Sequence, residues 1–262
     1  MHCTFALLLT VLVTAQDFDY RSQGLDWTGV CASGRSQSPI NFREVPQEPQ
    51  DMVYVSASNT TYIPLRFNYP DLDNYIAQQT TVAFQVTNIA GSLQAVRIGD
   101  TSPTSFALNR IVFHAPAEHL WNGARYPLEM QLEHTSDSGS MAIVAVWFVR
   151  SAQRSPFLDS LLDGGIAQLS EELGGVSQDY YFYMGSLTTP PCTEGVNWFV
   201  PRIGLRNALP ASPDQIAFFS SMWAGDSDFA SGFGNDRQDQ LVNDRYVYHF
   251  IPSPSDSQSF LQ

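Results

Sequence analysis

The chain has 262 residues, with 44% hydrophobic and 15% charged residues, which suits an ordered globular protein and excludes a low-complexity chain. Its formal net charge is −13, and arginine supplies all of the fixed positive charge because the sequence contains no lysine. A field of that sign repels nucleic acid, heparin-like glycans and anionic membranes. We therefore expect no nucleic-acid partner. The charge favours cations, basic proteins or simply solubility.

The N-terminus has the pattern of a secretory signal peptide. The apolar run over residues 5–13 is too short to span a bilayer, and Val13-Thr14-Ala15 offers small residues for cleavage before Gln16. A buried N-terminal strand is the alternative interpretation. We expect residues 1–15 to be the signal peptide of a secreted, extracellular protein, residues 16–252 to form one domain, and residues 253–262 to be a polar tail. No other segment has the pattern of a membrane span.

The middle of the chain is strand-like, since β-branched and aromatic residues alternate there with polar ones. Helix signals are sparser: a serine followed by proline precedes apolar segments at Ser155-Pro156 and again at Ser212-Pro213. This pattern predicts a β-dominated, mixed α+β fold with a few short helices. The clearest predicted strands are Thr81–Thr87, Leu93–Ile98, Phe106–His114, Arg125–His134 and Met141–Val149.

Two cysteines, Cys31 and Cys192, remain once Cys3 leaves with the signal peptide. An even pair in an oxidising compartment favours one disulfide, although two separate buried thiols would give the same count. Closing a loop of this length contributes roughly 4–5 kcal/mol in the chain-entropy model. Asn59-Thr60-Thr61 is an N-glycosylation sequon, so Asn59 is a candidate glycosylation site.

Five segments, in order along the chain, together resemble the alpha-class carbonic anhydrases. The resemblance covers residues 18–248 and implies a single domain built on a large central, mostly antiparallel sheet. Cysteines at the positions of Cys31 and Cys192 form a disulfide in secreted members of that family. The segments are Gly34–Phe42, Phe113–His119, Tyr126–Glu129, Ser186–Cys192 with Asn197-Trp198 after it, and Asn235–Arg245.

The resemblance also implies a zinc site, and this sequence departs from it. A catalytic zinc of this kind needs three protein ligands and an open position for water. The family's three histidine positions fall on Val112, His114 and Gln131. Valine has no lone pair to donate, and an amide oxygen is a poor zinc ligand beside imidazole. We therefore expect no bound zinc and no other cofactor, with His114 as the one remaining ligand.

Residues that support the metal in the family are retained. Thr188 matches the family's gatekeeper threonine, and Glu118 matches the carboxylate that accepts the hydroxyl proton of that threonine and orients it. Glu129 matches the carboxylate that holds the third ligand, and His119 and Tyr183 match a buried hydrogen-bonding pair beside it. Either these groups are a vestigial catalytic relay, or they simply satisfy one another's hydrogen bonds, which we favour.

The family's proton-shuttle histidine falls on Val82, which carries no ionisable group.

Glu133 also departs from the family resemblance, but at a position that is not a zinc ligand. Strand alternation places Glu129, Gln131 and Glu133 on one face, and the family has an apolar cavity-wall residue at the position of Glu133. A buried carboxylate needs a partner. The hypothesis from sequence is that Glu133 pairs with His114 where the metal would lie. The rival hypothesis is a weak, non-native metal site made by His114, Gln131 and Glu133.

Two classes of function follow. The favoured one is a non-catalytic, secreted protein that acts as an extracellular binding or structural module, with an extracellular protein or matrix component as its unidentified partner. The alternative is an enzyme: a zinc-dependent carbonic anhydrase that hydrates CO2 to bicarbonate at an unusual or weak metal site, or a residual esterase. His134 and His249 stand alone in the sequence and are interpreted as structural.

Overall fold

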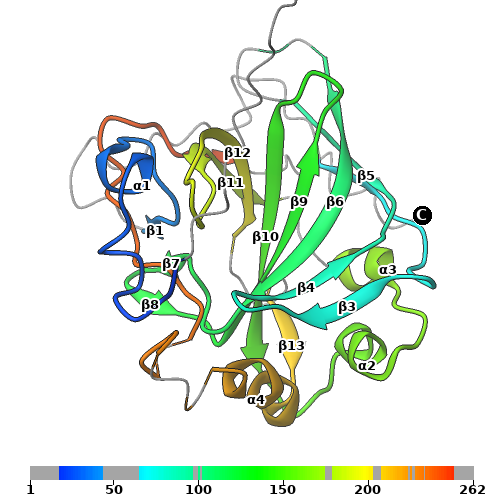
Figure 1. Ribbon diagram of the computed structural model, residues 1–262. Coiled ribbons are helices and arrows are strands. Elements are labelled where there is room, and N and C mark those ends of the chain that lie inside the picture. Colours follow the sequence, from blue (N-terminus) through cyan, green and yellow to red (C-terminus); the bar gives the residue numbers. More distant parts are fainter. Residues whose placement is uncertain are drawn as a thin grey trace, which may run out of the picture.

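A large curled β-sheet runs through the middle of the computed structural model (Figure 1). The structure describes residues 18–43, 65–96, 100, 102–174, 179–202, 208–223, 225, 228–232 and 234–250. The signal peptide, Asn59 and the polar tail fall outside the described residues. The strands of the large sheet are β2 (Arg66–Asn68), β3 (Ile76–Gln79), β4 (Phe84–Thr87), β5 (Ser92–Ala95), β6 (Thr104–His114), β9 (Leu128–Thr135), β10 (Met141–Arg150), β11 (Tyr180–Ser186), β12 (Glu194–Pro201), β13 (Leu209–Ala211) and β14 (Tyr248–Phe250).

Within the described residues the strand order is β14-β11-β12-β10-β9-β6-β4-β3, with β13 beside β10 and with β5 and β2 following from β6. β10 pairs in parallel with β12 and β13, and the other pairs in this sheet are antiparallel. This confirms the predicted fold class. A small second sheet contains β1 (Asn41–Phe42), β7 (Leu120–Trp121) and β8 (Ala124–Arg125), and the helices are α1 (Val30–Ser33), α2 (Pro156–Asp163), α3 (Leu169–Gly174) and α4 (Pro213–Ser221).

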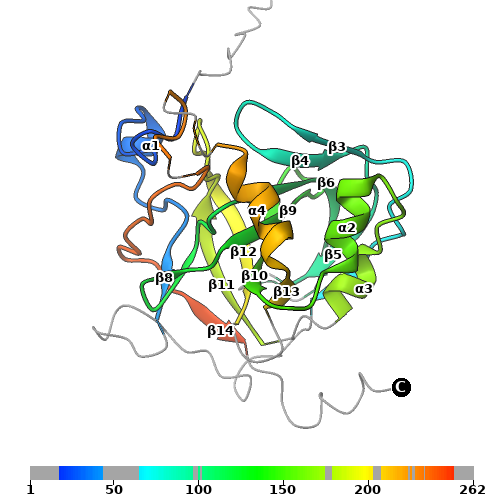
Figure 2. The ribbon, with the colours of Figure 1, turned by 90° about the horizontal axis from the view of Figure 1, so that it is seen from below.

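The sheet separates two environments. Helices α2, α3 and α4 lie against one face (Figure 2) and close the main apolar core with alternate residues of β6, β9 and β10. The other face carries a second core rich in aromatic residues, including Trp147, Tyr183 and Trp198. Because successive strand residues point to opposite faces, Leu128, Met130 and Leu132 enter the main core. Glu129, Gln131 and Glu133 consequently face the other side, as the alternation predicts.

The ends of two predicted strands differ from the sequence interpretation for local reasons. β4 begins at Phe84 rather than Thr81 because Thr80 and Ala83 close a turn through a backbone hydrogen bond of 2.8 Å. The predicted run Arg125–His134 divides between β8 and β9, and Pro127, which has no N–H for the ladder, lies at the break.

The predicted disulfide between Cys31 and Cys192 is confirmed, with the two Cα atoms 5.0 Å apart. It connects α1 to the loop between β11 and β12, the loop that carries Thr188 and Thr189. Tyr20, Trp27 and Trp223 bury it in a separate apolar cluster. The loop that covers the candidate site is therefore held covalently to the N-terminal part of the domain.

Candidate functional site

Two neighbouring strands, β6 and β9, supply the floor of the site. Their antiparallel register places Arg110 opposite Glu133, Val112 opposite Gln131, and His114 opposite Glu129. Strand alternation puts the members of each set on one face. The three positions at which the resemblance implies zinc ligands therefore lie together, and Arg110 joins them.

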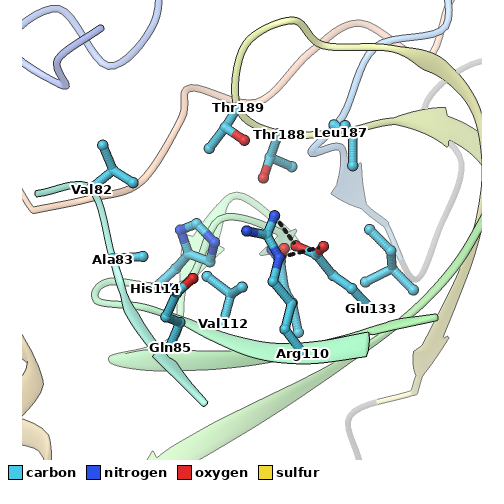
Figure 3. Close-up of a pocket in the computed structure, with 12 residues that line it drawn as sticks. Val82, Ala83, Gln85, Arg110, Val112, His114, Glu133, Leu187, Thr188 and Thr189 are labelled. Atoms are coloured by element: carbon cyan, nitrogen blue, oxygen red, sulfur yellow. Dashed lines mark hydrogen bonds and ion pairs between the residues drawn. The ribbon is translucent and has the colours of Figure 1, made fainter. Parts of the chain in front are cut away.

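Twelve residues line a cavity above this floor (Figure 3). Its volume is about 40 Å³, which is room for about three water molecules. The loop after β11 covers the cavity with Leu187, Thr188 and Thr189, and the segment before β4 contributes Val82 and Ala83. The full set is Val82, Ala83, Gln85, Arg110, Val112, His114, Gln131, Glu133, Ile143, Leu187, Thr188 and Thr189.

His114 is held in one orientation by the segment after residue 234. Its Nδ1 lies 2.7 Å from the backbone oxygen of Asn235. A carbonyl oxygen only accepts, so in the neutral ring Nδ1 carries the hydrogen and Nε2 has the lone pair, and His114 lines the cavity. The Asn235 side chain in turn accepts from the Ala115 N–H at 2.9 Å and donates to the Phe113 oxygen at 3.0 Å. His114 thus keeps the tautomer that a metal ligand needs.

Gln131 has a role that its sequence position does not reveal. Its Nε2 donates to Oε2 of Glu118 and to Oε1 of Glu129, both at 2.9 Å. The two carboxyl groups and the amide are all buried. Both N–H groups of the amide are therefore used to connect two buried carboxylates, and the amide nitrogen has no lone pair to offer a metal.

Glu129 is the most heavily bonded carboxylate of the site. It accepts from the backbone N–H and the ring Nδ1 of His119, both at 2.9 Å, from Gln131, and from Trp147 Nε1 at 3.1 Å. Burial by itself would raise the pKa of Glu129, but the charge of His119 and the hydrogen bonds from His119 and Gln131 outweigh it and lower the pKa to about 2.

The predicted contact between His119 and Tyr183 is confirmed at 2.7 Å, and the Tyr183 hydroxyl also lies 2.8 Å from the Ser38 hydroxyl. The resulting network runs from Gln131 through Glu129 and His119 to Tyr183 and Ser38, and all of these residues are buried.

The hypothesis that Glu133 pairs with His114 is wrong. Glu133 binds Arg110 instead, through Oε2 to Nε at 2.7 Å and Oε1 to Nη2 at 3.0 Å. The register explains the difference, because Arg110 lies directly opposite Glu133 whereas His114 lies opposite Glu129. Sequence reasoning missed Arg110, although its spacing of two residues from Val112 and four from His114 could have indicated a shared face.

The structure does not join Thr188 to Glu118 within the described residues, although the resemblance implies that contact. Oε2 of Glu118 accepts from Gln131, and Oε1 accepts from the backbone N–H of Arg237 at 3.0 Å. Nδ1 of His114 is also 3.5 Å from Oε1. Thr188 lies in the cavity wall together with Val82 at the shuttle position.

The donor set does not fit a three-ligand zinc ion. His114 offers one nitrogen, Val112 offers none, and Gln131 has its amide hydrogens on two carboxylates. Glu133, the further candidate ligand, has both oxygens on a guanidinium. In the part of the chain that the structure describes, no three His, Cys, Asp or Glu residues are grouped so that they could hold a metal.

A curled sheet with a buried polar centre on the face opposite α2, α3 and α4 defines the class of domain, and known proteins share it. A family model described as eukaryotic-type carbonic anhydrase matches residues 160–251. Dioscorin DB3S of Dioscorea polystachya is 32% identical over 234 residues, covering 84% of this chain and 78% of that protein. A carbonic anhydrase of Pectobacterium carotovorum is 28% identical and covers 94% of this chain and 98% of its own length.

Among solved structures, dioscorin complexed with ascorbate has a TM-score of 0.69 and 29% sequence identity, covering 86% of this chain and 90% of its own. The chain belongs to the alpha carbonic anhydrase family. None of the helices in the described residues is both long and apolar enough to cross a membrane.

Proposed function

We propose that this protein is a non-catalytic member of the family, secreted to the extracellular space, that acts by binding rather than by zinc catalysis. One observation carries the proposal. At the position of the third zinc ligand, the Gln131 amide connects Glu118 and Glu129 through two hydrogen bonds of 2.9 Å. Loss of a residue that only orients a ligand typically costs about 10–100-fold in metal affinity or activity, and here two ligands are replaced.

Some relatives carry the name carbonic anhydrase, so family membership alone does not decide whether this chain is an enzyme. Fold does not imply function, and the proposal rests on the donor set. The alternative is hydration of CO2 at a weak metal site formed by His114, Gln131 and Glu133. The pairing of Glu133 with Arg110 argues against it, because zinc would have to displace a bidentate guanidinium.

A stopped-flow assay of CO2 hydration with added zinc tests the proposal. We expect the wild-type chain to hydrate CO2 at the rate of buffer alone. The double variant Val112→His/Gln131→His restores three imidazoles, and we expect it to bind one zinc per chain and to gain activity that a sulfonamide abolishes. The single variant Val112→His is the matched control and has two imidazoles. A sulfonamide-sensitive rate in the wild type would overturn the proposal.

Secretion is supported by the disulfide, since such bonds persist in oxidising compartments. N-terminal sequencing of protein from culture medium is expected to begin at Gln16. An intact Met1 on exported protein would contradict the signal-peptide assignment.

Removal of N-linked glycans is expected to lower the apparent mass of the wild type but not of Asn59→Gln. The extracellular partner is to be sought by cross-linking and capture in the medium or matrix where the protein is expressed.

A further inference from the structure

The guanidinium of Arg110 is a fixed cation in the cavity where the family has a metal. It reaches the cavity from β6, on the same face as Val112 and His114. Figure 3 shows it between His114 and Glu133, with both of its marked contacts on the Glu133 side. The Arg110 side chain is 40% exposed and that of Glu133 is 11% exposed. The cation is therefore at the mouth of the cavity and can be reached by a solute.

Glu133 does not use all the donors of Arg110. A guanidinium has five N–H donors in a planar fork, and Glu133 engages one on Nε and one on Nη2. No described residue accepts from Nη1. The remaining edge, formed by Nη1 and the second hydrogen of Nη2, has the spacing that a second carboxylate matches with two parallel hydrogen bonds.

His114 sets a second requirement on a ligand. It is 2% exposed, its Nδ1 donates to Asn235, and Nε2 faces the cavity as an acceptor. A ligand that fills this part of the cavity therefore needs an O–H or N–H group to avoid leaving a buried acceptor without a partner. The hydroxyl groups of Thr188 and Thr189 lie across the cavity (Figure 3) and can accept from or donate to the same ligand.

The size and the charge of the cavity further restrict the class of ligand. A volume of about 40 Å³ holds about three waters, so the ligand has only a few non-hydrogen atoms. The overall charge of −13 does not decide affinity in the cavity, because exposed charges are screened beyond about 8 Å at physiological ionic strength. The Arg110–Glu133 pair is neutral as a unit, which predicts weak binding that increases when Glu133 loses its charge.

We propose that the cavity is a metal-independent site for a short hydroxycarboxylate, with its carboxylate on the remaining edge of Arg110 and its hydroxyl on Nε2 of His114. The inference rests on the proposed function, because it assigns a ligand to the cavity that we propose binds no zinc. The guanidinium takes the place of the metal as the cation that attracts the anion.

Ligand-observed NMR titration of the secreted, chelator-treated protein with glycolate tests the site. Acetate, which lacks the hydroxyl, is expected to bind about 2–10-fold more weakly, because it cannot form the one neutral hydrogen bond that the hydroxyl makes. Arg110→Gln is expected to weaken glycolate binding about tenfold or more because it removes a charge-assisted contact. Arg154→Gln is the matched control, since Arg154 is also paired with carboxylates but lies at the surface.

Glu133→Gln gives a result of opposite sign and keeps the test valid if Arg110→Gln fails to fold. Replacing the carboxylate with a neutral amide removes the competing negative charge and leaves one oxygen acceptor beside the guanidinium, so glycolate binding is expected to tighten. Equal affinity of the wild type and both variants, or no binding at all, would refute the hydroxycarboxylate site while leaving the hydration result unaffected. Glycolate binding that is present in untreated protein and absent after chelator treatment would instead show a metal and overturn both proposals.

Discussion

Replacing Gln131 with leucine removes the connection between two buried carboxylates and should destabilise the fold. Gln131→Leu has similar volume, so the loss is that of two hydrogen bonds of 2.9 Å rather than of packing. Leaving a buried partner unsatisfied costs about 1–3 kcal/mol, and more when the partner is charged. Glu118 and Glu129 are both 0% exposed, so water cannot compensate. We expect the free energy of unfolding to fall by about 3–5 kcal/mol.

The assay is urea denaturation at pH 7, followed by tryptophan fluorescence. For a domain of this size the expected loss corresponds to a Tm lower by about 6–20 °C. Gln85→Leu is the matched control, because Gln85 lines the same cavity but makes no hydrogen bond to a carboxylate within the described residues. We expect it to change stability by less than about 1 kcal/mol. An equally small change in Gln131→Leu would refute the reasoning.

Three further predictions concern stability elsewhere in the domain. Replacing Cys31 and Cys192 together with alanine should lower the free energy of unfolding by about 5 kcal/mol in the chain-entropy model, measured by denaturation without reductant; no loss would contradict a closed disulfide in the purified protein. Burial lowers the pKa of His134 to about 4 from an ordinary value of 6.5, so the unfolded chain binds the proton first as pH falls. The contribution of the neutral ring to the free energy of unfolding is complete above pH 6.5 and is lost as the pH falls toward 4. Between these pH values the free energy of unfolding of His134→Gln should therefore fall by about 3 kcal/mol less than that of the wild type. An identical pH dependence of stability in the two proteins would contradict this prediction. Ser155→Ala removes the helix cap on the Leu158 N–H and should cost about 1–2 kcal/mol, which thermal denaturation would detect.

The fold was largely predictable because apolar and polar residues alternate in β9, β10 is a nearly continuous apolar run, and turns separate the strands. The small errors arose where one residue decides a boundary. Pro127 lies between β8 and β9, and β4 begins only after the turn that Thr80 and Ala83 close. These are local effects that compete with a longer hydrophobic pattern.

The site was predictable in its positions but not in its contacts. The family resemblance places Val112, His114 and Gln131 together, and strand alternation separates Glu129, Gln131 and Glu133 from the core face. It does not give the register between strands, which decides that Glu133 meets Arg110 rather than His114. Nor does a residue type reveal that an amide will divide its two hydrogens between two carboxylates. Such partners depend on which side chains the fold brings within about 3 Å.

The amide of Gln131 also affects how three imidazoles could be introduced at this site. Gln131→His alone would break the connection from Glu118 to Glu129 while supplying only two imidazoles, because Val112 would still offer no lone pair. The single variant Gln131→His would therefore be less stable than the wild type and would still lack a third zinc ligand. Val112→His alone places a second ring beside an intact amide and gains no third ligand. The order of the two changes therefore matters: Val112→His first keeps both hydrogen bonds of the amide, and Gln131→His second breaks them only when it completes a set of three imidazoles.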